Sequence, residues 1–195
     1  MRTRLETVPS KRLRGLTVIE LVMVVVIIAI VASIALPKFD INRYRNDGAG
    51  RLVRVLLQEA QRNAITRQSN VIVSFDLAYN RLRIVQDYNN NDTINVGDWV
   101  QYRKLPEGAR FLKPSWSGVN GAAPASTING SNLLTISGLT SIVFQRDGSA
   151  SSSLELYVGM RDNVQTDYRG LFTTQSTGRT EMFKWNGATW NRMTQ

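Results

Sequence analysis

A long run of apolar residues near the amino terminus constrains this chain more than any other feature. The run extends from Leu21 to Leu36, and Ser33 is its one polar member. Together with the residues just before it, the segment 16–36 would form a helix of about 30 Å, which is the thickness of the hydrocarbon core of a bilayer. The sequence therefore predicts a membrane-spanning helix within residues 16–41 and a separate domain after it.

Glu20 stands immediately before this apolar run. A charged side chain within hydrocarbon costs roughly 2.5–3.5 kcal/mol on insertion scales, so it needs a partner. The apolar run contains no charged residue that could serve. We therefore expect the partner of Glu20 to be a charged group on another subunit.

The first 15 residues form a basic leader with a single acid, Glu6, and five basic residues: Arg2, Arg4, Lys11, Arg12 and Arg14. Such charge holds the amino end on the cytoplasmic side of a membrane. An ordinary secretory signal peptide is one alternative, but its apolar core would be about 7–15 residues long and its cleavage site would follow that core. Here Gly15 precedes the apolar run. A plain signal anchor is another alternative, and it leaves Glu20 unexplained.

The segment Gly15-Leu16-Thr17-Val18-Ile19-Glu20, followed by apolar residues, resembles the class III signal of type IV prepilins and pseudopilins. Leu16 stands where that family usually has Phe, and Pro37 falls where many pilins have a proline that kinks the helix. The resemblance implies that a prepilin peptidase cleaves between Gly15 and Leu16 and methylates the new amino terminus. It also implies that Glu20 meets the methylated amino terminus of a neighbouring subunit. Other pilins, the peptidase and the inner membrane are thus the expected partners.

The composition excludes several chemistries. The chain has no cysteine and no histidine, so it can form no disulfide, no Cys or His zinc site and no Ser-His-Asp triad. The net charge of +9 is moderate, and removal of the leader would lower it. No convincing pair of carboxylates points to hydrolysis. We expect a structural protein rather than an enzyme.

The remaining sequence predicts an α+β domain over residues 42–195. Apolar residues recur at three- and four-residue steps between Asn42 and Arg67, which is typical of an amphipathic helix. We expect this helix to continue the membrane-spanning one and to pack on an antiparallel sheet of about seven or eight short strands. The strands are predicted at residues 71–75, 81–85, 99–105, 141–145, 154–158, 170–174, 180–185 and 189–193. Residues 115–138, rich in Ser, Gly, Asn and Ala, are predicted to form a flexible loop.

Several later segments, in the same order along the chain, resemble the GspH/FimT group of minor pseudopilins and minor pilins. They are Gln58-Glu59-Ala60, the predicted hairpin at 71–85, the acidic loop 87–98, Phe144 to Ser149 and Ser176 to Arg179. The resemblance implies a low-abundance, assembly-initiating subunit at the tip of a type II secretion pseudopilus or a type IV pilus. Its implied location is the inner membrane, with a single span and a periplasmic domain, and then the filament tip. The alternative function is a pilus-tip DNA receptor for natural transformation.

The loop 87–98 is a candidate calcium site. Oxygen-bearing side chains occupy its first, third, fifth, ninth and twelfth positions, which is the spacing of an EF-hand loop: Asp87, Asn89, Asn91, Asn95 and Asp98. Two features disagree, because Asp92 replaces the turn glycine and Asp98 replaces the longer bidentate Glu. The alternative is a turn in which short polar side chains satisfy their own backbone. We expect no other cofactor.

Gly178-Arg179 matches the start of a Gly-Arg-x-Arg motif of DNA-binding members of the group. Glu181 stands at the place of the second arginine, and an acid repels phosphate. Arg179 and Lys184 are therefore the candidate DNA-binding residues, but DNA is not the favoured partner.

Overall fold

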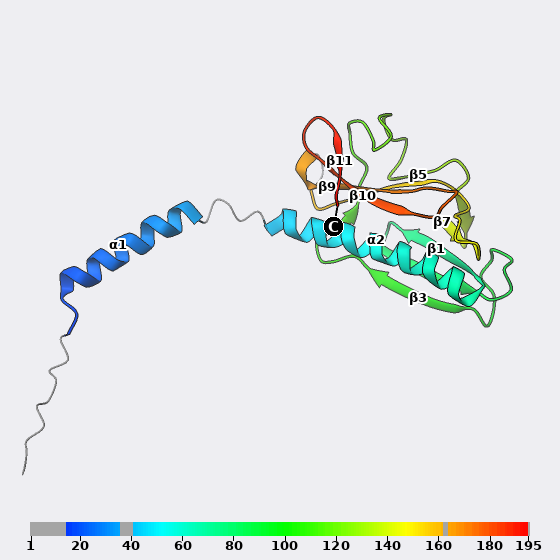
Figure 1. Ribbon diagram of the computed structural model, residues 1–195, viewed down its shortest axis with the longest axis horizontal. Helices are drawn as coiled ribbons and strands as arrows, with labels where there is room; N and C mark the ends of the chain where they lie inside the picture. The colour runs from blue at the N-terminus through cyan, green and yellow to red at the C-terminus, as the bar shows by residue number, and fades with distance from the viewer. Residues whose placement is uncertain (1–14, 36–40, 162–163, 195) are drawn as a thin grey trace, which may run out of the picture. The chain divides into compact units, whose positions relative to one another are not determined.

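The computed structural model describes residues 15–35, 41–161 and 164–194 (Figure 1). The chain divides into two compact units, Met1–Asp40 and Ile41–Gln195, and each is described by itself. The basic leader up to Arg14 and the predicted helix-kinking residue Pro37 lie outside the described residues.

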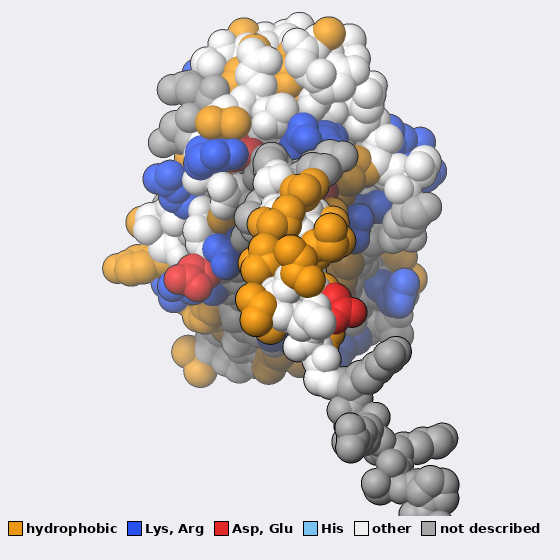
Figure 2. Space-filling model, turned by 90° about the vertical axis from the view of Figure 1, so that its left-hand side faces the viewer, with side chains coloured by type: hydrophobic (Ala, Val, Ile, Leu, Met, Phe, Trp, Pro, Cys, Tyr) orange, Lys and Arg blue, Asp and Glu red, His pale blue; other side chains and the backbone are white. Residues whose placement is uncertain are grey.

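Helix α1 spans Val18–Ala35 and consists almost entirely of apolar residues. Its large hydrophobic side chains are exposed from Val18 to Val31, by 50 % to 82 %. Figure 2 shows them clustered along this segment. In the part of the chain that the structure describes, no helix has the length and the hydropathy needed to cross a membrane. The membrane-spanning part of the sequence prediction is therefore not confirmed.

Helix α2, Ile41–Arg67, is amphipathic, as the sequence predicted. Its apolar stripe is at most 4 % exposed and comprises Ala49, Val53, Leu56, Leu57, Ala60 and Ala64. Gly50 lets the helix approach the sheet, since a Cβ there would lie 2.8 Å from Met182 Sδ. The helix ends at Arg67, and the left-handed φ of 53° at Gln68 terminates the helical geometry.

Eleven strands in the described residues form two antiparallel sheets, so the predicted single sheet of seven or eight strands is wrong. The first sheet has the order β3-β2-β1-β7-β6. Its strands are Trp99–Lys104, Arg81–Asp87, Asn70–Asp76, Leu139–Phe144 and Leu134–Ile136 in that order. The second sheet has the order β11-β10-β9-β8-β4. Its strands are Trp190–Arg192, Thr180–Trp185, Tyr168–Thr173, Leu154–Gly159 and Arg110–Phe111, and β5, Ile128–Asn129, pairs with β8.

Helix α2 holds the two sheets together. It contacts β1 and β7 of the first sheet and β8, β9 and β10 of the second. One hydrophobic core contains its buried stripe together with residues of both sheets, such as Phe75, Phe144 and Leu171. Burial of this apolar area is the main stabilising term of the domain.

The segment 115–138 differs from the predicted flexible loop, because it contains β5 and β6 and is fixed by aromatic packing. Trp116 packs edge-on against Tyr168, with ring centroids 4.8 Å apart. Val119 donates its N–H to Glu155 Oε1 at 2.7 Å and to the Tyr157 hydroxyl at 2.9 Å. Its Ser- and Gly-rich composition concealed these anchors.

Candidate functional site

The start of α1 is built by a capping box. The Thr17 N–H and its hydroxyl both donate to Glu20 Oε2 at 3.0 Å, and the Glu20 N–H donates to Thr17 Oγ1 at 3.3 Å. The reciprocal bonds satisfy backbone donors that the first helical turn leaves unpaired. Sequence analysis missed this role, although the Thr-x-x-Glu spacing is its known signature. Glu20 thus has a neutral local partner, whereas no described basic residue neutralises its charge.

The predicted cleavage site lies just before the capping box. Leu16 is 75 % exposed, so the bond that precedes it is not covered by the described structure. At Gly15 no described atom lies within 4 Å of the position that a Cβ would occupy. The described local structure therefore does not require glycine at this position.

Of the five predicted calcium-site residues, Asp87 is the last residue of β2 and the other four lie on the connection to β3. Asp87 Oδ2 accepts the Asp92 N–H at 2.7 Å, and Asn91 Oδ1 accepts the Thr93 N–H at 3.0 Å. Asp98 Oδ2 accepts the Asn95 N–H at 2.7 Å. The loop therefore has the side-chain-to-backbone turns that the alternative interpretation predicted. Residues 15–35, 41–161 and 164–194 contain no group of three or more His, Cys, Asp or Glu side chains that could hold a metal ion.

The two candidate DNA-binding residues do not form one surface. Arg179 is paired with Glu181, with Nε and Oε1 3.2 Å apart, and the same carboxylate also pairs with Arg192 at 2.7 Å. Lys184 is three positions from Glu181 on β10, so its side chain lies on the opposite face of the strand. The single carboxylate of Glu181 thus offsets part of the positive charge of the two arginines, which weakens this edge as a phosphate site.

The tryptophans near Lys184 belong to an aromatic cluster. Trp185 and Trp190 have ring centroids 5.4 Å apart, and Trp190 also packs on Tyr157 at 5.6 Å. Trp190 Nε1 donates to Ser117 O at 2.8 Å, so its polar group is used within the fold. Burial and the hydrogen bond to the Glu155 carboxylate raise the pKa of Tyr157. This cluster stabilises the 115–138 segment rather than offering rings for stacking on bases.

Two of the segments that resemble the GspH/FimT group, Phe144 to Ser149 and Ser176 to Arg179, are joined by Gln61 near the carboxyl end of α2. Gln61 Nε2 donates to Gly148 O at 2.7 Å and to Thr177 O at 2.6 Å. Gly178 has a φ of 62°, and a Cβ there would lie 2.2 Å from Gly148 O. Glycine is therefore required at 178 for close backbone packing, and this explains the Gly-Arg pair without DNA.

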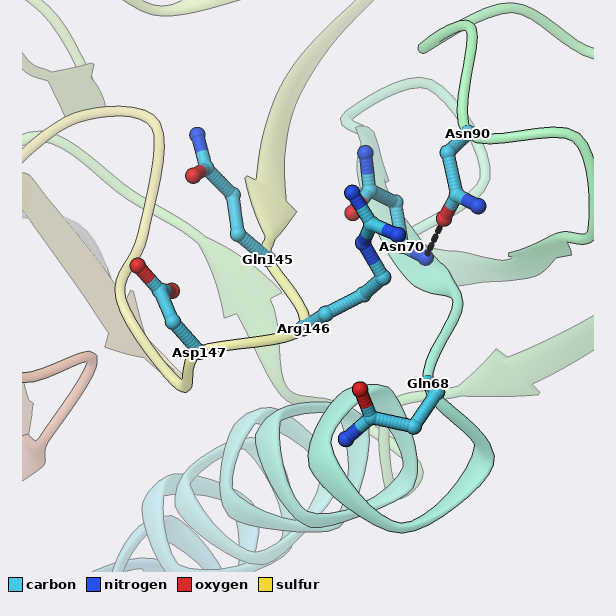
Figure 3. A pocket seen from close by; sticks show the side chains of 6 residues that line it. All are labelled: Gln68, Asn70, Asn90, Gln145, Arg146 and Asp147. Carbon is cyan, nitrogen blue, oxygen red and sulfur yellow. Dashed lines mark hydrogen bonds between the residues drawn. The ribbon is translucent and has the colours of Figure 1, made fainter.

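A polar pocket of about 500 Å³ lies beside this joint (Figure 3). Its lining residues are Gln68, Asn70, Asn90, Gln145, Arg146 and Asp147. In Figure 3 the Arg146 side chain extends toward Asn70, and Asp147 projects from the other side of the turn. Asp147 Oδ1 accepts the hydroxyl and the N–H of Ser149 at 2.7 and 2.8 Å, and these bonds lower its pKa. The Asp147 carboxylate thus forms hydrogen bonds within its own turn.

Comparison with known proteins places the chain near one kind of solved structure. No protein-family model and no curated protein matches the sequence. Two structures of the minor pseudopilin EpsH from the type II secretion system of Vibrio cholerae are similar, with 10 % and 13 % sequence identity. The matches cover 76 % and 75 % of this chain and 96 % and 98 % of EpsH, with TM-scores of 0.42 and 0.45.

Proposed function

We propose that this chain is a minor pilin or pseudopilin, a structural subunit that helps to initiate an inner-membrane-anchored filament. The observation that carries the proposal is α1: an exposed apolar helix, in a compact unit separate from the domain, that begins at Glu20's capping box. An apolar surface of this length is not stable in water and needs a cover. Helices of neighbouring subunits and lipid both provide one.

The features at the amino end support the same role. The exposed Leu16 and the structurally unconstrained Gly15 suit cleavage of the bond between them by a prepilin peptidase. Cleavage would place the new, methylated amino group of Leu16 four residues from Glu20. Each Glu20 would then be free to meet the amino terminus of a neighbour, where an opposite charge stabilises the ionised carboxylate. The basic leader orients the chain so that the domain is periplasmic before assembly.

We propose a structural role and no catalysis, with other pilin-like subunits as the partners. Type II secretion and type IV pili both fit this arrangement. The DNA-receptor alternative receives no support from the Arg179–Glu181 pair.

Intact-mass analysis of the full chain, extracted from cells that contain a prepilin peptidase, tests the proposal. The wild type should begin at Leu16 and carry one methyl group, and Gly15→Leu should remain a full-length precursor. Gly48→Leu is a matched control, since Gly48 likewise has no atom near its Cβ position, and it should be cleaved normally. Cleavage at any other bond, or an uncleaved wild type, would contradict the proposal.

A further inference from the structure

Asp87 is a buried carboxylate with one unpaired oxygen. Asp87 is 0 % exposed. Its Oδ2 accepts the Asp92 N–H, and its Oδ1 has no hydrogen-bond partner. A buried carboxylate oxygen without a hydrogen-bond partner costs free energy. Among the described residues no Lys or Arg forms an ion pair with Asp87, Asp92 or Asp98. A cation at Oδ1 would satisfy this oxygen.

Other side-chain oxygens of the loop accept hydrogen bonds from backbone N–H groups of the same loop. Asn89 Oδ1 and Asn91 Oδ1 each accept the N–H of the residue two positions on, at 3.3 and 3.0 Å. Asp98 closes the loop, since its two oxygens accept the N–H groups of Tyr88 and Asn95 at 3.3 and 2.7 Å. The first, third, fifth and twelfth positions of a calcium loop are therefore folded back on one short connection.

The structure removes one of the two objections to calcium. The sixth position of such a loop needs a sharp turn, which glycine usually provides. Asp92 adopts that conformation, with a φ of 57°, and its N–H makes the bond to Asp87. Its side chain is used outside the loop, because Asn70 Nδ2 donates to Asp92 Oδ1 at 2.9 Å. An aspartate can hold this place, since Asp tolerates the left-handed region better than most residues.

We propose that residues 87–98 bind one calcium ion. The ligands are Asp87 Oδ1, the amide oxygens of Asn89 and Asn91, the backbone carbonyl of Thr93 and the Asp98 carboxylate. The ion replaces Thr93 Oγ1 and Asn95 Nδ2, which now donate to Asn91 Oδ1 at 2.7 and 3.1 Å. The site has only two carboxylate ligands, Asp87 and Asp98, and its other ligands are amide and carbonyl oxygens. It is independent of the proposed filament role.

The ligand set selects both the ion and its affinity. Oxygen donors without nitrogen or sulfur favour a hard cation, and a flexible loop favours Ca²⁺ over Mg²⁺, which demands a small and regular octahedron. Asp98 is shorter than the usual bidentate Glu, so the affinity belongs to the weak class, with a dissociation constant of about 10⁻⁴–10⁻³ M. That range suits calcium concentrations outside the cytoplasm.

Titration of the purified full chain in detergent, after removal of metal with a chelator, tests the proposal. Calorimetry with CaCl₂ alone should show one site per chain, and MgCl₂ at the same concentrations should show much weaker binding. Calcium should also raise the melting temperature of the wild type. Asn89→Ala and Asp98→Asn should each weaken calcium binding about tenfold or more, because the first removes a ligand oxygen and the second removes the negative charge of a ligand.

Asp147→Asn is the matched control, since Asp147 also accepts backbone and hydroxyl donors of its own turn but lies outside the loop. It should bind calcium as the wild type does. Asp87→Asn should lose binding; if it fails to fold, the two exposed-loop variants decide the outcome. Absence of calcium binding by the wild type, equal binding of magnesium, or unchanged affinity in Asn89→Ala and Asp98→Asn would overturn the proposal.

Discussion

The two helices of this protein differ in where their apolar side chains find contacts. On α2 the apolar residues form one stripe, and Val53, Leu57 and Ala64 are fully buried within the domain. On α1 the apolar residues surround the helix, and side chains such as Ile27 are more than half exposed. An amphipathic helix is complete within its own domain, whereas a helix that is apolar all round requires other molecules. The apolar residues of α2 thus stabilise its own unit, whereas those of α1 are available for the assembly that we propose.

Substitution of Glu20 is expected to have the largest effect, which is a loss of incorporation into filaments. Its variants also distinguish local capping from pairing between subunits. Glu20→Ala should be cleaved but should enter filaments only at a small fraction of the wild-type level. Glu20→Gln should fail in the same way, since its amide oxygen still accepts the Thr17 donors but carries no charge. Thr17→Val removes the hydroxyl, keeps the charge and should assemble. Shearing of filaments, followed by immunoblotting, measures incorporation.

Normal incorporation of Glu20→Gln would show that capping is the function of this residue. The proposed charged contact between Glu20 and a neighbouring subunit would then be absent, and α1 would contact its neighbours through apolar packing alone.

The next largest effect is expected when an aspartate replaces an apolar residue on one of the two helices and the free energy of unfolding is measured. Leu56→Asp should lower the free energy of unfolding of the domain by roughly 3–5 kcal/mol, because Leu56 is 4 % exposed and the new charge would be buried without a partner. Val55→Asp on the same helix and Ile27→Asp on α1 should change it little, since both residues are more than half exposed. Chemical denaturation followed by tryptophan fluorescence measures the differences. A destabilised Ile27→Asp would show that α1 contributes to domain stability.

The sequence predicted the helices and strands whose apolar residues recur at regular spacing. It did not predict the elements that depend on contacts between distant parts of the chain. The stripe of α2 and the strands β1, β2 and β10 follow directly from spacing. The strands β4, β5 and β6 have two or three residues each, too few for an alternation to be visible. The division into two sheets is set by long-range pairings such as Val71 with Phe144 and Leu156 with Leu171. Local sequence carries no information on these.

The candidate sites show the same division. The class III pattern at Gly15 to Glu20 is local, and so is the capping box that it contains. The spacing of the 87–98 loop was visible as well, but the unpaired oxygen of Asp87 depends on burial by the sheet. The joint at Gln61 unites three segments that are far apart in sequence, so its structural role was hidden.

The Asp76–Arg81 pair, at the β1–β2 turn, gives a smaller, pH-dependent effect within the domain. Burial raises the pKa of Asp76, but hydrogen bonds from Arg81 at 2.8 Å and from the Tyr79 N–H at 3.2 Å outweigh it and lower the pKa below its ordinary 3.8. The ionised Asp76 carboxylate therefore stabilises the folded state at pH values above 3.8. This stabilisation is lost as the pH falls through the lower pKa that Asp76 has in the folded protein. Asp76→Asn should cost about 1 kcal/mol at neutral pH.

The difference between wild type and Asp76→Asn should shrink as the pH is lowered below 3.8, where the unfolded chain begins to bind the proton. Glu107→Gln, which removes an exposed carboxylate outside any described ion pair, should show no such trend. Urea denaturation at several pH values provides the measurement. A gap between wild type and Asp76→Asn that does not change with pH would contradict the ion-pair account.

DNA binding by the domain is expected to be the smallest effect. Strong binding would contradict the comparison of the two helices, which relates function to α1. Arg179 and Arg192 share Glu181, so the wild type should bind duplex DNA weakly and only at low salt. Arg179→Ala should therefore change binding little, whereas Glu181→Arg should strengthen it and steepen its salt dependence, since more phosphates would be neutralised. A gel shift of the full chain in detergent at several salt concentrations compares these variants. Tight wild-type binding that Arg179→Ala abolishes would move the function from α1 to the domain surface and make the DNA receptor the leading interpretation.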